Sequence, residues 1–169
     1  MKIKSSVVAW LALGLLCVAC GKKESVPSVS EKTTGDRELH WLTDFGAAKT
    51  AARTRKKTLL VNFTGSDWCP PCLAMEKTVF SQPEFAAYAS KNLVLMEVDF
   101  PRRKKQAPEL AAANQKLASE YGVDGFPTIG ILDPDGKPLG ALGYRPDITV
   151  ESFIAEIEKL RSVAGKAGS

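Results

Sequence analysis

Residues 65–72 read Gly65-Ser66-Asp67-Trp68-Cys69-Pro70-Pro71-Cys72 (GSDWCPPC), and only two prolines separate the two cysteines. Such a pair can be a redox centre, half of a metal site or a structural staple. The apolar run Thr58–Phe63 precedes it and predicts a buried strand, whereas Leu73–Phe80 continues with helical spacing. Prolines are tolerated in a first helical turn because the amides there have no intrahelical partner. We therefore expect the cysteines at the junction of a strand and a helix.

The two cysteines are not equivalent at such a junction. Cys69 would lie at the helix N-terminus, where unpaired amides and the positive end of the helix dipole stabilise a thiolate. Cys72 would lie within the helix, nearly beneath it. The pair can close a small disulfide in which Cys69 carries the outer sulfur that a substrate can reach. This asymmetry predicts Cys69 as the nucleophile that attacks a target disulfide and Cys72 as the resolving thiol.

The rest of the chain alternates between helical and strand patterns. The turn sequence Asp133-Pro134-Asp135-Gly136 separates two strand patterns and predicts that they pair antiparallel. This order indicates an α/β fold with a central mixed sheet and helices on both faces. The further expected elements are a helix over Leu42–Ala52, a helix over Phe85–Ala89, a strand at Leu93–Val98, a helix over Glu109–Tyr121, strands at Ile129–Leu132 and Lys137–Tyr144, and a helix over Ile148–Leu160.

The N-terminus has the layout of a secretory signal. Lys2 and Lys4 supply positive charge, and a mostly apolar, uncharged stretch follows up to Ala19-Cys20. A small residue directly before a cysteine resembles the bacterial lipoprotein signal, which implies cleavage and acylation of Cys20, although Cys17 stands where that pattern usually has Leu. Simple secretion or a retained anchor are the alternatives. We expect an exported protein tethered to a membrane through its N-terminus, with a lipid anchor, facing the periplasm or the cell exterior.

Length and composition fit one domain with an appendage. The 169 residues are 44% hydrophobic and 25% charged. We expect a signal segment at 1–20, a flexible linker at 21–38, a domain at 39–162 and a flexible tail at 163–169. The charges are nearly balanced and do not indicate nucleic acid. The one basic cluster, Arg102–Lys105, is interpreted as a solvated loop or as a partner-docking patch.

Counting cysteines narrows the uses of the pair. If the signal is removed and Cys20 acylated, Cys69 and Cys72 are the remaining thiols, which outside the cytoplasm favours redox chemistry or a staple. Structural zinc needs four ligands, more than the two cysteines of this pair supply. Covalent haem attachment needs a histidine directly after the second cysteine, and Leu73 stands there. We therefore expect no resident metal or cofactor.

Two motifs together resemble the thioredoxin superfamily. Trp68-Cys69-Pro70-Pro71-Cys72 follows an apolar strand, and Gly125-Phe126-Pro127-Thr128 precedes a later strand about 55 residues on. The resemblance spans about Leu39 to Arg161 and is nearer to exported thioredoxin-like proteins, including the C-terminal domain of the bacterial thiol:disulfide interchange protein, than to cytosolic thioredoxin. It implies a thioredoxin-like fold, a cis Phe126–Pro127 bond facing the cysteines, and a substrate-binding surface formed by Trp68, Phe126 and Pro127.

Two departures from that family bear on the mechanism. Asn62 stands where thioredoxin has a titratable Asp, so Asp67, Glu97 or water must move the proton of the resolving cysteine. The two prolines have no amide hydrogen to offer the Cys69 thiolate, which favours a reductase over a strong oxidant with a potential near about −120 mV. We expect a thiol-disulfide oxidoreductase that acts on protein disulfides with an unidentified thiol electron donor. A non-catalytic scaffold and a soft-metal chaperone are the alternatives.

Overall fold

The computed structural model of the chain describes residues 39–167, with side-chain detail as far as Val163. These residues belong to one of two units of the chain, Gly35–Ser169. The predictions for the signal segment 1–20, for acylation of Cys20 and for the linker 21–38 concern residues outside the described range.

Five strands form one mixed sheet in the order β1-β3-β2-β4-β5. The three strands β1 (Trp41–Leu42), β3 (Leu93–Asp99) and β2 (Thr58–Thr64) run parallel. The strand β4 (Thr128–Leu132) is antiparallel to β2, and β5 (Pro138–Gly143) is antiparallel to β4. The turn at residues 133–136 thus joins two antiparallel neighbours, as predicted from its sequence.

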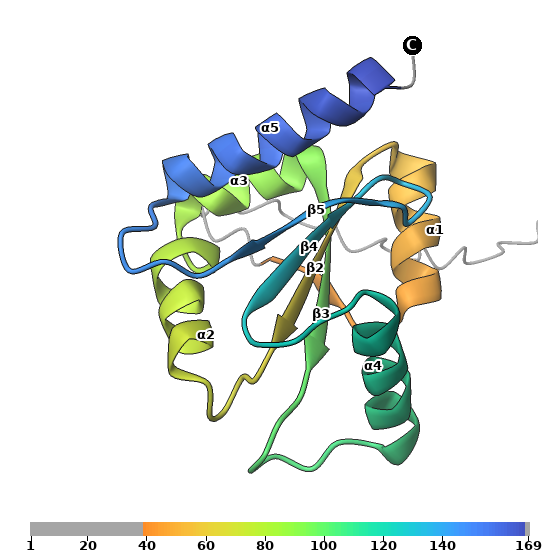
Figure 1. Cartoon of the computed structure of the whole chain (residues 1–169), viewed down its shortest axis with the longest axis vertical. Coiled ribbons are helices and arrows are strands. Elements are labelled where there is room, and N and C mark those ends of the chain that lie inside the picture. The colour runs from red at the N-terminus through yellow and green to blue at the C-terminus, as the bar shows by residue number, and fades with distance from the viewer. Residues whose placement is uncertain (1–38, 168–169) are drawn as a thin grey trace, which may run out of the picture. The chain divides into compact units, whose positions relative to one another are not determined.

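Helices cover both faces of this sheet, so the predicted α/β architecture is confirmed (Figure 1). On one face lie α1 (Phe45–Arg55) and α4 (Pro108–Glu120). On the other, called the α2 face below, lie α2 (Pro70–Met75), the π-helical turn η1 (Glu76–Phe80), α3 (Pro83–Asn92) and α5 (Val150–Ala167).

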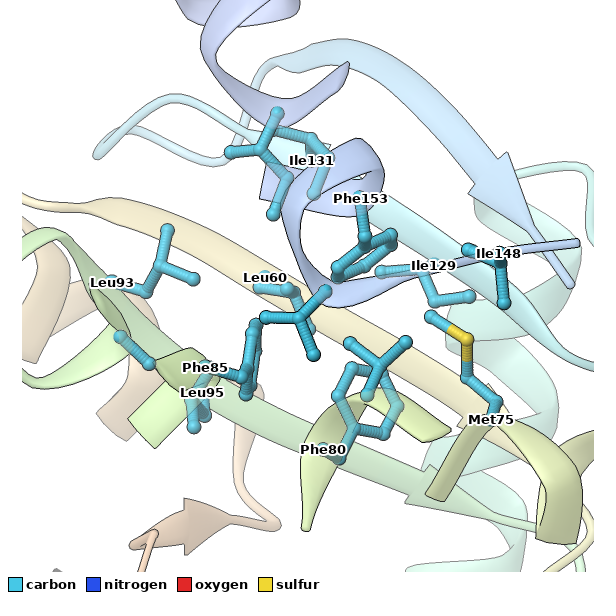
Figure 2. Close-up of a cluster of buried hydrophobic side chains, with 14 residues drawn as sticks. Leu60, Met75, Phe80, Phe85, Leu93, Leu95, Ile129, Ile131, Ile148 and Phe153 are labelled. Atoms are coloured by element: carbon cyan, nitrogen blue, oxygen red, sulfur yellow. The ribbon is translucent and has the colours of Figure 1, made fainter. Parts of the chain in front are cut away.

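The core of the α2 face is a cluster of aromatic and aliphatic side chains (Figure 2). Its centre is a group of three rings from η1, α3 and α5: Phe80 lies 5.2 Å from Phe85 and 5.9 Å from Phe153 between ring centroids. Leu60 of β2 faces this cluster, whereas its neighbour Leu59 faces the opposite one, as the alternation of a strand requires. All residues of β2 are buried, which explains its continuous apolar sequence.

Several element boundaries differ slightly from the prediction, and three larger differences change the assigned structure. The prediction that Leu42 begins the first helix is wrong, because Leu42 pairs with Met96 in β1 and Asp44 caps α1 by accepting the N–H of Ala47 at 2.6 Å. The helix after the cysteines changes to a π-helical turn, in which the N–H of Ser81 donates to the carbonyl of Glu76. Helix α5 continues to Ala167, beyond the predicted end at Leu160.

Candidate functional site

Cys69 and Cys72 lie where β2 leads into α2, as predicted, and they form a disulfide with an S–S distance of 2.10 Å. Cys69 is the N-cap of α2, and its Sγ accepts the N–H of Cys72 at 3.3 Å. Pro70 and Pro71 occupy the first helical positions and have no N–H to donate. The Cys72 amide is therefore the first-turn donor that reaches the outer sulfur.

The exposed fraction of the whole residue does not distinguish the two cysteines. Cys69 is 3% exposed and Cys72 is 5% exposed in this disulfide form. Their surroundings differ instead. Cys69 caps α2 and directly follows Trp68, whereas Cys72 lines a polar cavity.

Trp68 connects the cysteine motif to two neighbouring loops. Its Nε1–H donates to the carbonyl of Phe100 at 2.7 Å, and its ring meets the Phe126 ring edge-on with centroids 6.1 Å apart. Gly65 makes room for this ring, because a Cβ there would lie 2.6 Å from it. The Phe126–Pro127 peptide bond is cis, as expected from the family resemblance. The loop that carries this bond thus lies beside the residue that precedes Cys69.

Asp67 holds the loop that follows β3. Its carboxylate accepts the backbone N–H groups of Arg102, Arg103 and Lys104 at 2.8–2.9 Å. These bonds, that from Arg102 foremost, lower the pKa of Asp67. Asp99 makes a second connection of this kind, because its carboxylate accepts both the N–H and the Oγ–H of Ser66. The motif GSDW is thereby fastened to the end of β3 and to the segment after it.

A polar cavity of about 220 Å³ lies beside Cys72. Asn62 and Glu97, which face each other across β2 and β3, both line it. Burial, then the charges of Asp99 and Glu76, raise the pKa of Glu97. The Oδ1 of Asn62 is buried and has no hydrogen-bond partner among the described residues. The other lining residues are Thr64, Ser66, Leu73, Glu76, Asp99 and Lys104.

The structure brings together most of the residues that the sequence singles out. Asp67 and Trp68 directly precede Cys69, the Phe126 ring meets the Trp68 ring, and Glu97 lines the cavity beside Cys72. The sequence did not identify the hydrogen bonds of Asp67 and Asp99 or the cavity. An acidic residue at the end of a largely buried strand, Asp99, is a sequence signal that could have indicated this edge of the sheet.

Within residues 39–163 no three side chains of His, Cys, Asp or Glu gather in a way that could hold a metal ion. The same part of the chain contains no helix with the length and apolar character needed to span a bilayer.

Comparison with known proteins yields matches over this whole region. A family model of the thioredoxin-like domain matches residues 45–160. The disulfide bond reductase DsbH of Chlamydia pneumoniae is 32% identical over 140 residues, which cover 82% of this chain and 84% of that protein. A solved structure of a DsbH oxidoreductase superposes with a TM-score of 0.67 at 31% identity, covering 73% of this chain and 84% of the other.

A second group of relatives is much longer than this chain. The thiol:disulfide interchange protein DsbD of Vibrio vulnificus (strain CMCP6) is 31% identical over 109 residues, which cover 64% of this chain and only 17% of that protein. The reduced C-terminal domain of DsbD from Neisseria meningitidis superposes with a TM-score of 0.52 at 26% identity, covering 68% of this chain and 90% of the domain. The similarity to DsbD is therefore confined to one domain of it.

Proposed function

The chain belongs to the family of thioredoxin-like domains, and from this membership we propose that it is an exported thiol-disulfide oxidoreductase that reduces protein disulfides. The observation that carries the proposal is the Cys69–Cys72 disulfide at the start of α2, beside the loop of the cis Phe126–Pro127 bond. The similarity to a protein named disulfide bond reductase supports the direction of electron flow.

The proposed reaction begins with the reduced pair. The Cys69 thiolate attacks one sulfur of a substrate disulfide, a mixed disulfide forms, and one substrate thiolate leaves. Cys72 then gives up its proton and attacks Sγ of Cys69, which releases the second substrate thiolate and forms the Cys69–Cys72 disulfide. Two electrons pass to the substrate, and an external thiol donor must reduce the pair again.

Glu97 is the proposed acceptor of the Cys72 proton. Both residues line the same polar cavity, which is large enough for water, and the raised pKa of Glu97 brings its carboxylate nearer to the proton affinity of a thiol. Asn62 has no titratable group. Asp67 is the weaker candidate, because three backbone N–H groups occupy its carboxylate and lower its pKa.

Trp68, Phe126 and Pro127 are proposed to bind the polypeptide on either side of the substrate cysteine. The Trp68 and Phe126 rings meet next to Cys69, and the backbone of Phe126 would offer strand-like hydrogen bonds to an extended segment. No cofactor takes part in this scheme.

The prolines of the motif support a reducing pair. They leave the Cys72 amide as the N–H donor near Cys69. A Cys69 thiolate with few donors is stabilised less than the thiolate of a strong oxidant, so the reduced form is less favoured. We expect a potential between those of thioredoxin and protein disulfide isomerase, about −270 to −180 mV. A value near about −120 mV would refute the reductase assignment.

Insulin reduction tests the activity itself. The wild-type protein, supplied with dithiothreitol, should accelerate the precipitation of insulin chains, and Cys69→Ser should abolish the acceleration. Absence of turnover by the wild type, or turnover that survives Cys69→Ser, would favour a non-catalytic scaffold.

A membrane tether through acylated Cys20 completes the proposal, and its support is the sequence of residues 1–20. Expression in a bacterium with labelled palmitate should label the wild-type chain and not Cys20→Ser. Equal labelling of both chains, or of neither, would contradict lipid anchoring.

A further inference from the structure

The segment Arg102–Lys105, called the basic loop, joins β3 to α4 and exposes four consecutive cationic side chains. Across the described residues, no ion pair includes any of the four. The fold alone does not explain this run of charges, because a solvated connection needs no unbroken series of cations.

The backbone of the basic loop is held in place. Three of its N–H groups donate to the Asp67 carboxylate, and Gln106, which follows it, donates through Nε2 to the carbonyl of Asp99 at 3.1 Å. The carboxylates of Asp67 and Asp99 thus accept hydrogen bonds from the loop backbone and from Ser66, respectively. The four cationic side chains are exposed on a backbone that these hydrogen bonds fix.

The basic loop contacts two features next to the disulfide, the Trp68 ring and the cavity beside Cys72. The guanidinium of Arg102 stacks 3.5 Å from the centroid of the Trp68 ring, next to Cys69. Lys104 lines the cavity that contains Cys72. A polypeptide that brings its own cysteine to this pair must therefore pass close to these charges.

We propose that the basic loop is a docking surface for an acidic segment beside the reactive cysteine of the redox partner, an inference that rests on the proposed function. Charge complementarity selects the partner, and the fixed backbone reduces the entropy that the loop loses on binding. An anionic membrane is the less suitable occupant, because a bilayer resting on Arg102 would also cover Trp68, the residue that precedes Cys69.

Reduction of matched peptides by the full-length protein tests this inference. The probes are disulfide-linked dimers of one cysteine peptide with Glu, Ser or Lys flanking the cysteine, and the prereduced protein is mixed with each. At an ionic strength of about 0.01 M we expect the Glu peptide to react about fivefold faster than the Ser peptide and the Lys peptide to react slowest. The preference should nearly vanish at about 1 M, where the Debye length falls to about 3 Å.

Charge reversal locates the effect. In the Arg103→Glu/Lys105→Glu variant the preference should reverse in favour of the Lys peptide. The control Lys91→Glu/Lys159→Glu makes the same change of net charge on exposed positions of α3 and α5, and it should keep the wild-type preference. Equal rates for the three peptides, or equal effects of the two variants, would overturn the docking surface.

The outcomes separate this inference from the proposed function. Reduction of the Ser peptide without any charge preference would refute the basic loop as a docking surface and leave the reductase intact. No reduction of any peptide would overturn the proposed function and this inference with it. Binding to phosphatidylglycerol vesicles that Arg103→Glu/Lys105→Glu abolishes, without a peptide preference, would identify a membrane contact instead.

Discussion

Trp68→Phe removes the contacts that join the cysteine motif to the loop after β3. The substitution deletes the Nε1–H that donates to the Phe100 carbonyl at 2.7 Å and reduces the ring surface under Arg102. A phenyl ring can still meet Phe126 edge-on, so this contact with the loop of Pro127 should persist. The variant therefore isolates the connection to Phe100 and Arg102.

The expected loss of unfolding free energy follows from these two contacts. A neutral hydrogen bond contributes about 0.5–1.5 kcal/mol, and a cation over an aromatic ring at an exposed site about 0.5–1 kcal/mol, part of which Phe retains. We expect Trp68→Phe to lower the unfolding free energy by about 1–2 kcal/mol. In a cycle with Arg102→Ala, the coupling between the two positions should be about 0.5 kcal/mol.

Urea unfolding of the oxidised protein, followed by far-UV circular dichroism, measures both quantities. Trp41→Phe is the matched control, since Trp41 meets Phe80 edge-on at 5.2 Å and makes no indole hydrogen bond within the described residues. It should lose less than Trp68→Phe. A loss below about 0.5 kcal/mol for Trp68→Phe, or no coupling to Arg102, would refute the view that Trp68 fastens the loop.

Three further substitutions test the cavity, the loop and the core. Glu97→Gln should slow release of the mixed disulfide, and unchanged release rates would exclude Glu97 as the proton acceptor. It should also raise the unfolding free energy above pH 4.5, because burial raises the pKa of Glu97 from that ordinary value and its charged form opposes folding. Asp67→Asn should lower the unfolding free energy and speed hydrogen exchange at the amides of residues 102–104. Because the lowered pKa means that the ionised carboxylate stabilises the fold, the difference from wild type should narrow as the pH falls below 3.8, and a difference constant with pH would contradict this. Phe153→Ala should cost about 3–5 kcal/mol in urea unfolding by opening a cavity in the three-ring cluster, and a cost below about 1 kcal/mol would contradict its central place there.

The sequence predicted the architecture because its strongest patterns are local. The apolar run of β2 and the turn at 133–136 each indicate one element or one junction, and the cysteine motif together with the distant Pro127 motif added the resemblance to a known family. The apolar spacing of Leu42 fits a helix, but Leu42 pairs with Met96 in β1 and α1 begins only after its cap, Asp44.

The contacts around the site were less accessible to sequence reasoning. Asp67 accepts N–H groups from residues 35 to 37 positions away, and such bonds leave no periodic pattern. The cavity beside Cys72 depends on the register that sets Asn62 opposite Glu97, which side-chain alternation does not fix by itself. The sequence could name Asp67 and Glu97 as candidates, and the three-dimensional contacts distinguish a loop anchor from a cavity carboxylate.

Trapping of a mixed disulfide tests the central claim about Cys69 most directly. Reduced Cys72→Ser protein, mixed with a disulfide-linked peptide, should accumulate a covalent adduct that mass spectrometry assigns to Cys69, because the resolving thiol is gone. The claim would be contradicted if no adduct forms, or if Cys69→Ser forms an equivalent adduct through Cys72.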